Sequence, residues 1–164
     1  MTRFSATEAK RLGLTSVSKK KTSIGRPIKT YTTKAQWQAQ SAPGGILFIL
    51  PENLPSLNVW KAWHWGKQDR FKKNLTHNLG ILALTIGKPR FERARVEVRH
   101  FFRVQRRRDT DNMAPKFLLD ALREAGVLAD DNAEVLEVPE ARIGVDREYW
   151  RTEIWIFELG VSHE

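Results

Sequence analysis

The chain lacks cysteine altogether. Its 164 residues include no Cys and four His, so a disulfide framework, an iron–sulfur cluster on thiolates and a thiolate zinc site are all excluded. The histidines, at positions 64, 77, 100 and 163, are too far apart in sequence to form a metal-ligand motif. Any metal ion would therefore have to be held mainly by carboxylates.

Long apolar runs are also missing. No stretch approaches the roughly 18 to 20 residues that a membrane-spanning helix needs, and residues 1–14 are polar, without a signal-like apolar segment. These absences predict a cytoplasmic protein with no membrane partner. The length and the 41% of hydrophobic residues suit one globular domain.

Acidic residues are scarce before position 109. Residues 1–45 carry nine basic residues and one acid, and residues 61–108 carry fourteen basic residues and three acids, whereas residues 109–164 carry fourteen acids and five basic residues. The basic part predicts a polyanionic partner, with nucleic acid as the first candidate. The acidic part would repel the same phosphates, so it needs its own explanation, either a solvated face or a cation site.

The composition divides the chain at a breaker cluster, Ser-Ala-Pro-Gly-Gly at 41–45. Residues 1–45 hold few large aliphatic side chains and are predicted to form a basic extension, with short helices over 5–12 and 34–40. Residues 46–164 are predicted to form the compact domain.

Periodicity predicts the elements of this domain. Apolar residues alternate in 93–102 and recur every three or four positions in 68–86 and 117–125, which is typical of a strand and two helices respectively. Further strands are predicted over 46–50, 135–143 and 149–159. The order β-α-β-α-β-β indicates an α+β domain with a mixed sheet.

The sign change in charge falls on the segment Arg-Arg-Arg-Asp-Thr-Asp-Asn at 106–112. Residues two apart at a strand end point the same way, so Asp109 and Asp111 can direct two carboxylates at one point. The pair Asp130 and Asp131 follows the next helix, which can return it towards the first pair. Mg²⁺ would remove the repulsion among these carboxylates. The alternative is that Asp111 or Asn112 caps a helix, and that Asp130 or Asp131 caps a turn.

Phosphate contacts are predicted beside this acidic segment. Guanidinium groups match phosphate bidentately, and Lys116, in the first turns of the helix, could reach a scissile phosphate; its alternative is a contact with Asp120. The three tryptophans at 60, 63 and 65 could stack on bases or fill the core. The residues predicted to contact DNA are Arg106, Arg107, Arg108, Lys72, Lys73, Arg70 and Asn58.

These motifs resemble the RusA-type Holliday-junction resolvases, small endodeoxyribonucleases of bacteria and their prophages. The resemblance covers about residues 46–159 and is carried by Arg-Asp-Thr-Asp-Asn at 108–112, Lys116, Leu-Asp-Ala-Leu at 119–122, Gly126, Asp130-Asp131 and the Leu-Pro-Ser-Leu-Asn segment at 54–58.

The resemblance implies an α+β homodimer that resolves four-way DNA junctions by paired symmetric nicks, in recombination and repair. It implies that Mg²⁺, with Mn²⁺ as a substitute, is held by Asp109, Asp111 and Asp131, with Asp130 as the less favoured member of the pair. Lys116 would be the essential lysine and Arg108 a phosphate contact. Two alternatives stay open: a catalytically silent junction-binding protein, and a nuclease that acts on other branched DNA.

Overall fold

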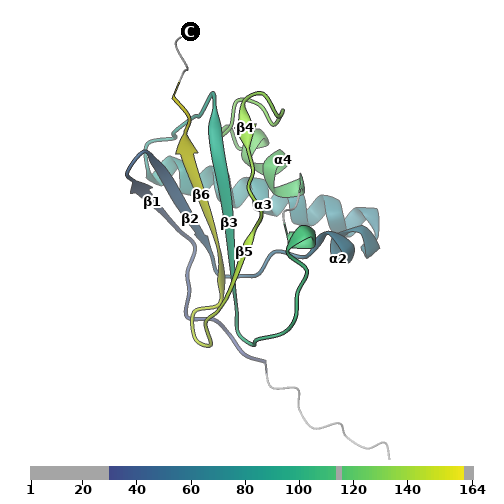
Figure 1. The fold of residues 1–164 in the computed structure, drawn as a ribbon. Helices are drawn as coiled ribbons and strands as arrows, with labels where there is room; N and C mark the ends of the chain where they lie inside the picture. The colour runs from purple at the N-terminus through teal and green to yellow at the C-terminus, as the bar shows by residue number, and fades with distance from the viewer. Residues whose placement is uncertain (1–29, 114–115, 161–164) are drawn as a thin grey trace, which may run out of the picture. The chain divides into compact units, whose positions relative to one another are not determined.

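The computed structural model describes residues 30–113 and 116–160 (Figure 1). The chain divides into two units, Met1–Tyr31 and Thr32–Glu164. Every helix and strand reported below belongs to the second unit. The helix predicted over 5–12 lies outside the described residues.

A single mixed sheet forms the centre of the second unit. Its strands follow the order β1-β2-β6-β3-β4, with β5 also paired to β3. Neighbours from β1 to β3 are antiparallel, whereas β4 and β5 run parallel to β3. The α+β prediction with a mixed sheet is therefore confirmed. The strands are β1 (Gln38–Ala42), β2 (Gly45–Leu50), β3 (Ala94–Phe102), β4 (Leu136–Glu137), β5 (Arg142–Val145) and β6 (Arg151–Glu158).

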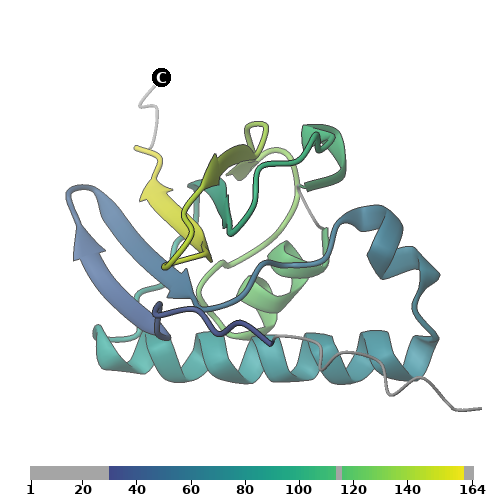
Figure 2. The ribbon, with the colours of Figure 1, turned by 90° about the horizontal axis from the view of Figure 1, so that it is seen from below.

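Three α-helices accompany the sheet, α2 (Leu57–Ala62), α3 (Trp65–Thr85) and α4 (Lys116–Glu124). A short 3₁₀ helix, η1 (Thr110–Met113), precedes α4. Two views show that α3 and α4 pack on the same face of the sheet (Figures 1 and 2). Their caps follow from the sequence: the Ser56 hydroxyl accepts a hydrogen bond at the start of α2, and Gly126 has the positive φ of 80° that glycine tolerates after a helix.

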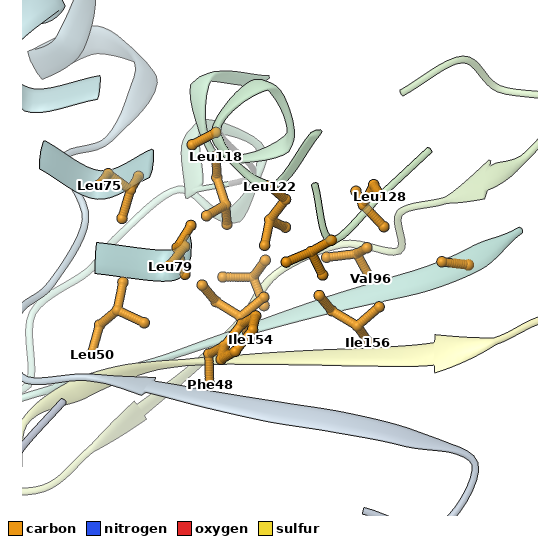
Figure 3. Close-up of a cluster of buried hydrophobic side chains, with 14 of the residues drawn as sticks. Phe48, Leu50, Leu75, Leu79, Val96, Leu118, Leu122, Leu128, Ile154 and Ile156 are labelled. Carbon is orange, nitrogen blue, oxygen red and sulfur yellow. The ribbon is translucent and has the colours of Figure 1, made fainter. Parts of the chain in front are cut away.

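The hydrophobic core lies between this sheet face and the two helices (Figure 3). Alternate residues of β3 are buried from Ala94 to His100, as the period of two in a strand requires, and β6 buries Thr152, Ile154 and Ile156 on one face and Glu153 on the other. The largest fully buried apolar side chains are Phe48, Leu50, Leu79, Leu118, Leu122, Leu128, Ile154 and Ile156.

The amino-terminal side of the domain differs from the prediction. Residues 38–42, assigned above to the extension and partly to a helix over 34–40, form β1 and pair with β2 from Gln38 opposite Ile49 to Ala42 opposite Gly45. β1 is an exposed edge strand, so it does not need the large aliphatic residues that mark a buried strand. Its polarity is the reason that composition placed it outside the core.

The segment after α4 also differs. The single strand predicted over 135–143 is divided into β4 and β5, and Pro139 lies between them. Proline has no amide hydrogen to donate to a neighbouring strand, so the pairing with β3 stops there and resumes at Arg142.

Candidate functional site

A pocket of about 360 Å³ brings together segments that are far apart in the sequence. One wall comes from the 51–58 segment after β2, and the other from the segment between β3 and α4. The lining combines an apolar floor with hydroxyl, amide, guanidinium and carboxylate groups. The lining residues are Leu54, Ser56, Asn58, Phe102, Arg108, Asp109, Asn112 and Met113.

The 51–58 segment is tied to the end of the sheet. The Asn53 side-chain amide donates hydrogen bonds to the carbonyls of Phe101 (3.0 Å) and Arg151 (3.2 Å), on β3 and β6. The Ser56 hydroxyl then accepts from the Val59 amide, 3.4 Å away, and so starts α2. These contacts place Ser56 and Asn58 at the pocket.

Arg108 is held in a defined position by its neighbours. Its guanidinium lies over the Phe102 ring, 3.5 Å from the centroid, and Nη1 donates to the carbonyls of Val104 and Arg106, each 3.2 Å away. Partial burial, followed by the nearby Arg106 charge, lowers the pKa of Arg108. The cation is therefore presented to the pocket by a fixed guanidinium, a suitable group for an anion.

Asp109 and Asn112 form a local turn on the same wall. The Asn112 side-chain amide donates to Asp109 Oδ2 (3.3 Å), and the Asn112 backbone amide donates to the Asp109 carbonyl (3.3 Å). Asp111 lies exposed in η1 between them. The Thr110 hydroxyl donates to the Glu140 carboxylate, which attaches η1 to the segment that precedes β5.

The second acidic pair has local partners. Asp130 accepts hydrogen bonds from the Asp131 amide (2.7 Å) and the Asn132 side chain (2.8 Å), and these bonds lower the pKa of Asp130. Asp131 forms an ion pair with Arg123 at 3.1 Å. In residues 30–113 and 116–160, no three His, Asp or Glu side chains converge in a way that could hold a metal ion. The expected convergence of three or four carboxylates is therefore not present in this arrangement.

The basic residues predicted to contact DNA are in different situations. Lys72 bridges α3 to α4 through Asp120 (3.6 Å) and Glu124 (2.9 Å), and the hydrogen bond that Lys72 donates to Glu124 is the main reason that the pKa of Lys72 is raised. Lys73 pairs with Asp69 one helical turn away, and Arg70 donates to the Gly66 carbonyl. Arg106 and Arg107 are exposed next to Arg108, and Lys116 is exposed at the start of α4.

The tryptophans divide between core and surface. Trp60 stacks on Phe117 with 4.3 Å between ring centroids and also contacts Trp63 and Phe71. Trp65 is 74% exposed. Two of the three tryptophans thus belong to an aromatic cluster that packs α2 against α3 and α4.

His100 was not identified from the sequence as a residue of the site. The apolar floor of the pocket, which Leu54, Phe102 and Met113 form, was not identified either. His100 is buried, 0% exposed. A signal was available: His100 continues the alternation of Ala94, Val96 and Val98, which places it on the buried face of the strand.

The comparisons with known proteins do not return the expected family. No family model matches the chain, and no curated protein matches it. Similar solved structures include crystal structures of the periplasmic domain of MotB. One, from Helicobacter pylori, is 13% identical with a TM-score of 0.39, over 76% of this chain and 83% of that chain. Another is 14% identical with a TM-score of 0.38, over 99% of this chain and 88% of that chain.

These comparisons contradict the assignment to the RusA-type family, which is withdrawn. The predictions that depended on it are withdrawn as well: a metal-dependent endodeoxyribonuclease, resolution of four-way junctions, binding of branched DNA by a homodimer, and a role in recombination and repair. A physical reason lies in the motif itself. Asp109, Asp130 and Asp131 all have local turn or ion-pair partners, roles that acidic residues fill in many folds.

The predicted cytoplasmic location is withdrawn as well, since the solved structures found are described as the periplasmic domain of MotB. At 13–14% identity and TM-scores below 0.4, the MotB structures establish neither a location nor an activity for this chain. Within the described part of the chain, no helix has both the length and the apolar composition needed to cross a membrane.

Proposed function

We propose that this chain binds a phosphate-bearing ligand at the Arg108–Asp109 pocket, with Mg²⁺ shared between the ligand and the acidic wall. The observation that carries the proposal is the placement of a fixed guanidinium and a carboxylate in one pocket with Ser56 and Asn58. The proposal concerns binding, and it includes neither strand cleavage nor branched DNA.

Arg108 is the group that would bind the phosphate. Its Nη1 is engaged by two carbonyls and its face lies on Phe102, so little side-chain freedom remains to be lost when an anion binds. A guanidinium has five N–H donors, and those on Nε and Nη2 are not used by the Val104 and Arg106 carbonyls. Hydrogen bonds between ionised partners are about twice as strong as neutral ones.

Asp109 and Asp111 are the groups that would hold Mg²⁺. This ion prefers oxygen ligands, keeps several waters, and is usually held by one or two carboxylates together with ligand phosphates. Asp109 lines the pocket and Asp111 lies exposed in the adjacent η1, and within the described residues no group of three acidic or histidine side chains could hold a metal ion by itself. This arrangement fits an ion shared with ligand phosphates better than an ion held by the protein alone. Because Asn112 donates to Asp109 Oδ2, the orientation of that carboxylate is set before an ion arrives. Bound Mg²⁺ would neutralise phosphate charge that Asp109 alone would repel.

The test is calorimetric titration of the full chain with inorganic pyrophosphate, in Mg²⁺ and in EDTA. We expect binding that depends on Mg²⁺. Arg108→Gln should weaken it by roughly tenfold or more, as expected for loss of a hydrogen bond to a charged group. Asp109→Asn should remove the dependence on Mg²⁺.

Two control variants separate the pocket from general electrostatics. Arg107→Gln removes the same charge from a neighbour that does not line the pocket, and Asp69→Asn removes an acid on α3. Both should bind pyrophosphate within about twofold of the wild type at 0.15 M salt. Equal losses in Arg107→Gln and Arg108→Gln, or equal binding in Mg²⁺ and EDTA, would contradict the proposal.

A further inference from the structure

We propose that His100 is the positioning residue of the Arg108–Asp109 pocket: its imidazole joins the two pocket walls and supports the ring on which Arg108 rests. The expected effect of His100 on ligand binding rests on the proposed function. The expected ordering of the two walls by His100 rests on the geometry of the described residues.

A chain of hydrogen bonds runs through His100 from one wall to the other. The Leu54 amide donates to the Thr152 hydroxyl oxygen (3.3 Å), that oxygen lies 3.2 Å from His100 Nδ1, and His100 Nε2 lies 3.1 Å from the Met113 carbonyl. Leu54, from the 51–58 segment, and Met113, from η1, both line the pocket. Both ends of the chain are therefore backbone groups of the site itself.

The acceptors determine the tautomer of the imidazole. A carbonyl oxygen can only accept, so His100 Nε2 must carry the hydrogen that is donated to Met113. His100 Nδ1 lies 3.2 Å from the Thr152 hydroxyl oxygen. That hydroxyl donates its hydrogen to the Glu52 carbonyl, 2.9 Å away, and accepts from the Leu54 amide. Thr152 thereby connects His100 to two backbone groups of the 51–58 segment.

A stack of side chains connects His100 to Arg108. His100 and Phe102 are two residues apart on β3, and their rings lie 6.0 Å apart at 26°. Phe102 also contacts the Arg108 guanidinium, which lies 3.5 Å from the centroid of its ring. His100 is completely buried and touches no solvent. Its contribution to the site is thus to hold Met113, Thr152 and Phe102, each of which holds a pocket group.

Two matched pairs of variants test this role. His100→Gln places an amide nitrogen near the position of Nε2 and keeps a donor for the Met113 carbonyl, whereas His100→Asn is too short to reach it. Thr152→Ser keeps the hydroxyl, whereas Thr152→Val has almost the same shape without it. Hydrogen exchange of the 52–54 and 110–113 amides measures whether the walls stay ordered, and calorimetry with pyrophosphate and Mg²⁺ measures binding.

We expect His100→Asn and Thr152→Val to lose pyrophosphate affinity by roughly three- to tenfold, the range for one buried hydrogen bond. Faster exchange at 110–113 should accompany the loss in His100→Asn. His100→Gln and Thr152→Ser should recover most of both properties. If His100 served only the stability of the fold, His100→Asn and His100→Gln would both have a lower melting temperature. They would not differ from each other in pyrophosphate affinity or in exchange at 110–113.

The outcomes separate the two proposals. If the wild type does not bind pyrophosphate, the proposed function fails, and the exchange data still decide whether His100 orders both walls. If the wild type binds while His100→Asn and His100→Gln match in affinity and in exchange, the positioning role is overturned and the proposed function stands. An imidazole whose ¹⁵N shifts place the hydrogen on Nδ1 would also overturn it.

Discussion

The ion pair between Arg123 and Asp131 allows two roles of Asp131 to be separated by experiment. Asp131 is one of the carboxylates that the sequence suggests as a metal ligand, yet its Oδ1 lies 3.1 Å from Arg123 Nη1. We predict that Asp131 serves the fold: Asp131→Asn should lower the free energy of unfolding and leave Mg²⁺ affinity within about twofold of the wild type.

The size of the effect follows from exposure. The Asp131 side chain is 18% exposed but the Arg123 side chain is 42% exposed, so solvent screens the pair and the expected coupling is about 0.5–1 kcal/mol. Asp131→Asn keeps the backbone amide that donates to Asp130. The change therefore removes the charge and leaves the turn after α4 in place.

A double-mutant cycle supplies the assay. Urea unfolding of Asp131→Asn, Arg123→Gln and the double variant, in EDTA, gives the coupling free energy. Mg²⁺ titrations of the same proteins give the affinity. This prediction would be refuted by a coupling free energy near zero together with a Mg²⁺ affinity that falls about tenfold in Asp131→Asn and rises in Arg123→Gln. A rise in Arg123→Gln would identify Asp131 as a metal ligand, because a carboxylate freed from its ion pair binds Mg²⁺ more tightly.

Further predictions concern stability. A Cβ on Gly45 would lie 1.9 Å from the Ile156 carbonyl oxygen, so Gly45→Ala should destabilise the fold by about 3 kcal/mol or more. A Cβ on Gly80, in α3, would meet no atom within 4 Å, so Gly80→Ala should stabilise the fold by about 0.5–1 kcal/mol. Urea unfolding measures both free energies, and equal effects of the two substitutions would contradict the prediction. Burial lowers the pKa of His100 below its ordinary 6.5, so below pH 6.5 the unfolded chain takes up a proton that the folded chain does not. The free energy of unfolding of the wild type, measured relative to His100→Gln, should be constant above pH 6.5. As the pH falls from 6.5 towards the pKa of folded His100, this difference should decrease by at most about 1.4 kcal/mol per pH unit. An increase of the difference at pH 5.5 would show that the folded protein favours imidazolium.

Elements with strong periodicity could be predicted from the sequence. The alternation in 93–102 and the three- and four-residue spacing in 117–125 match β3 and α4 to within a residue or so at each end. Periodicity did not predict the elements that are exposed or very short, because such elements contain too few buried apolar residues to form a repeating pattern. β1 is a polar edge strand, and α2 has only six residues, so neither contains an apolar face that periodicity can detect.

Three residues that line the candidate pocket were named from the sequence, and their roles stay predictions. Arg108, Asp109 and Asn58 do share a pocket, and both the acidic wall and the adjacent cation were visible in the sequence. Lys72 was not predictable, since its partners Asp120 and Glu124 lie about fifty residues away on another helix. Nor was His100, whose partners come from β6 and η1.

The sequence by itself determined the α+β class, the absence of thiolate chemistry and the sharp change of charge at Asp109, because these depend on composition and on contacts between near neighbours. Only the tertiary structure decided which charges are paired, where Arg108 points and how His100 joins the pocket walls. Those properties depend on strand register and on hydrogen bonds between distant segments, such as Leu54 to Thr152. Local patterns carry no information about such pairings, since they follow from the way the whole chain packs.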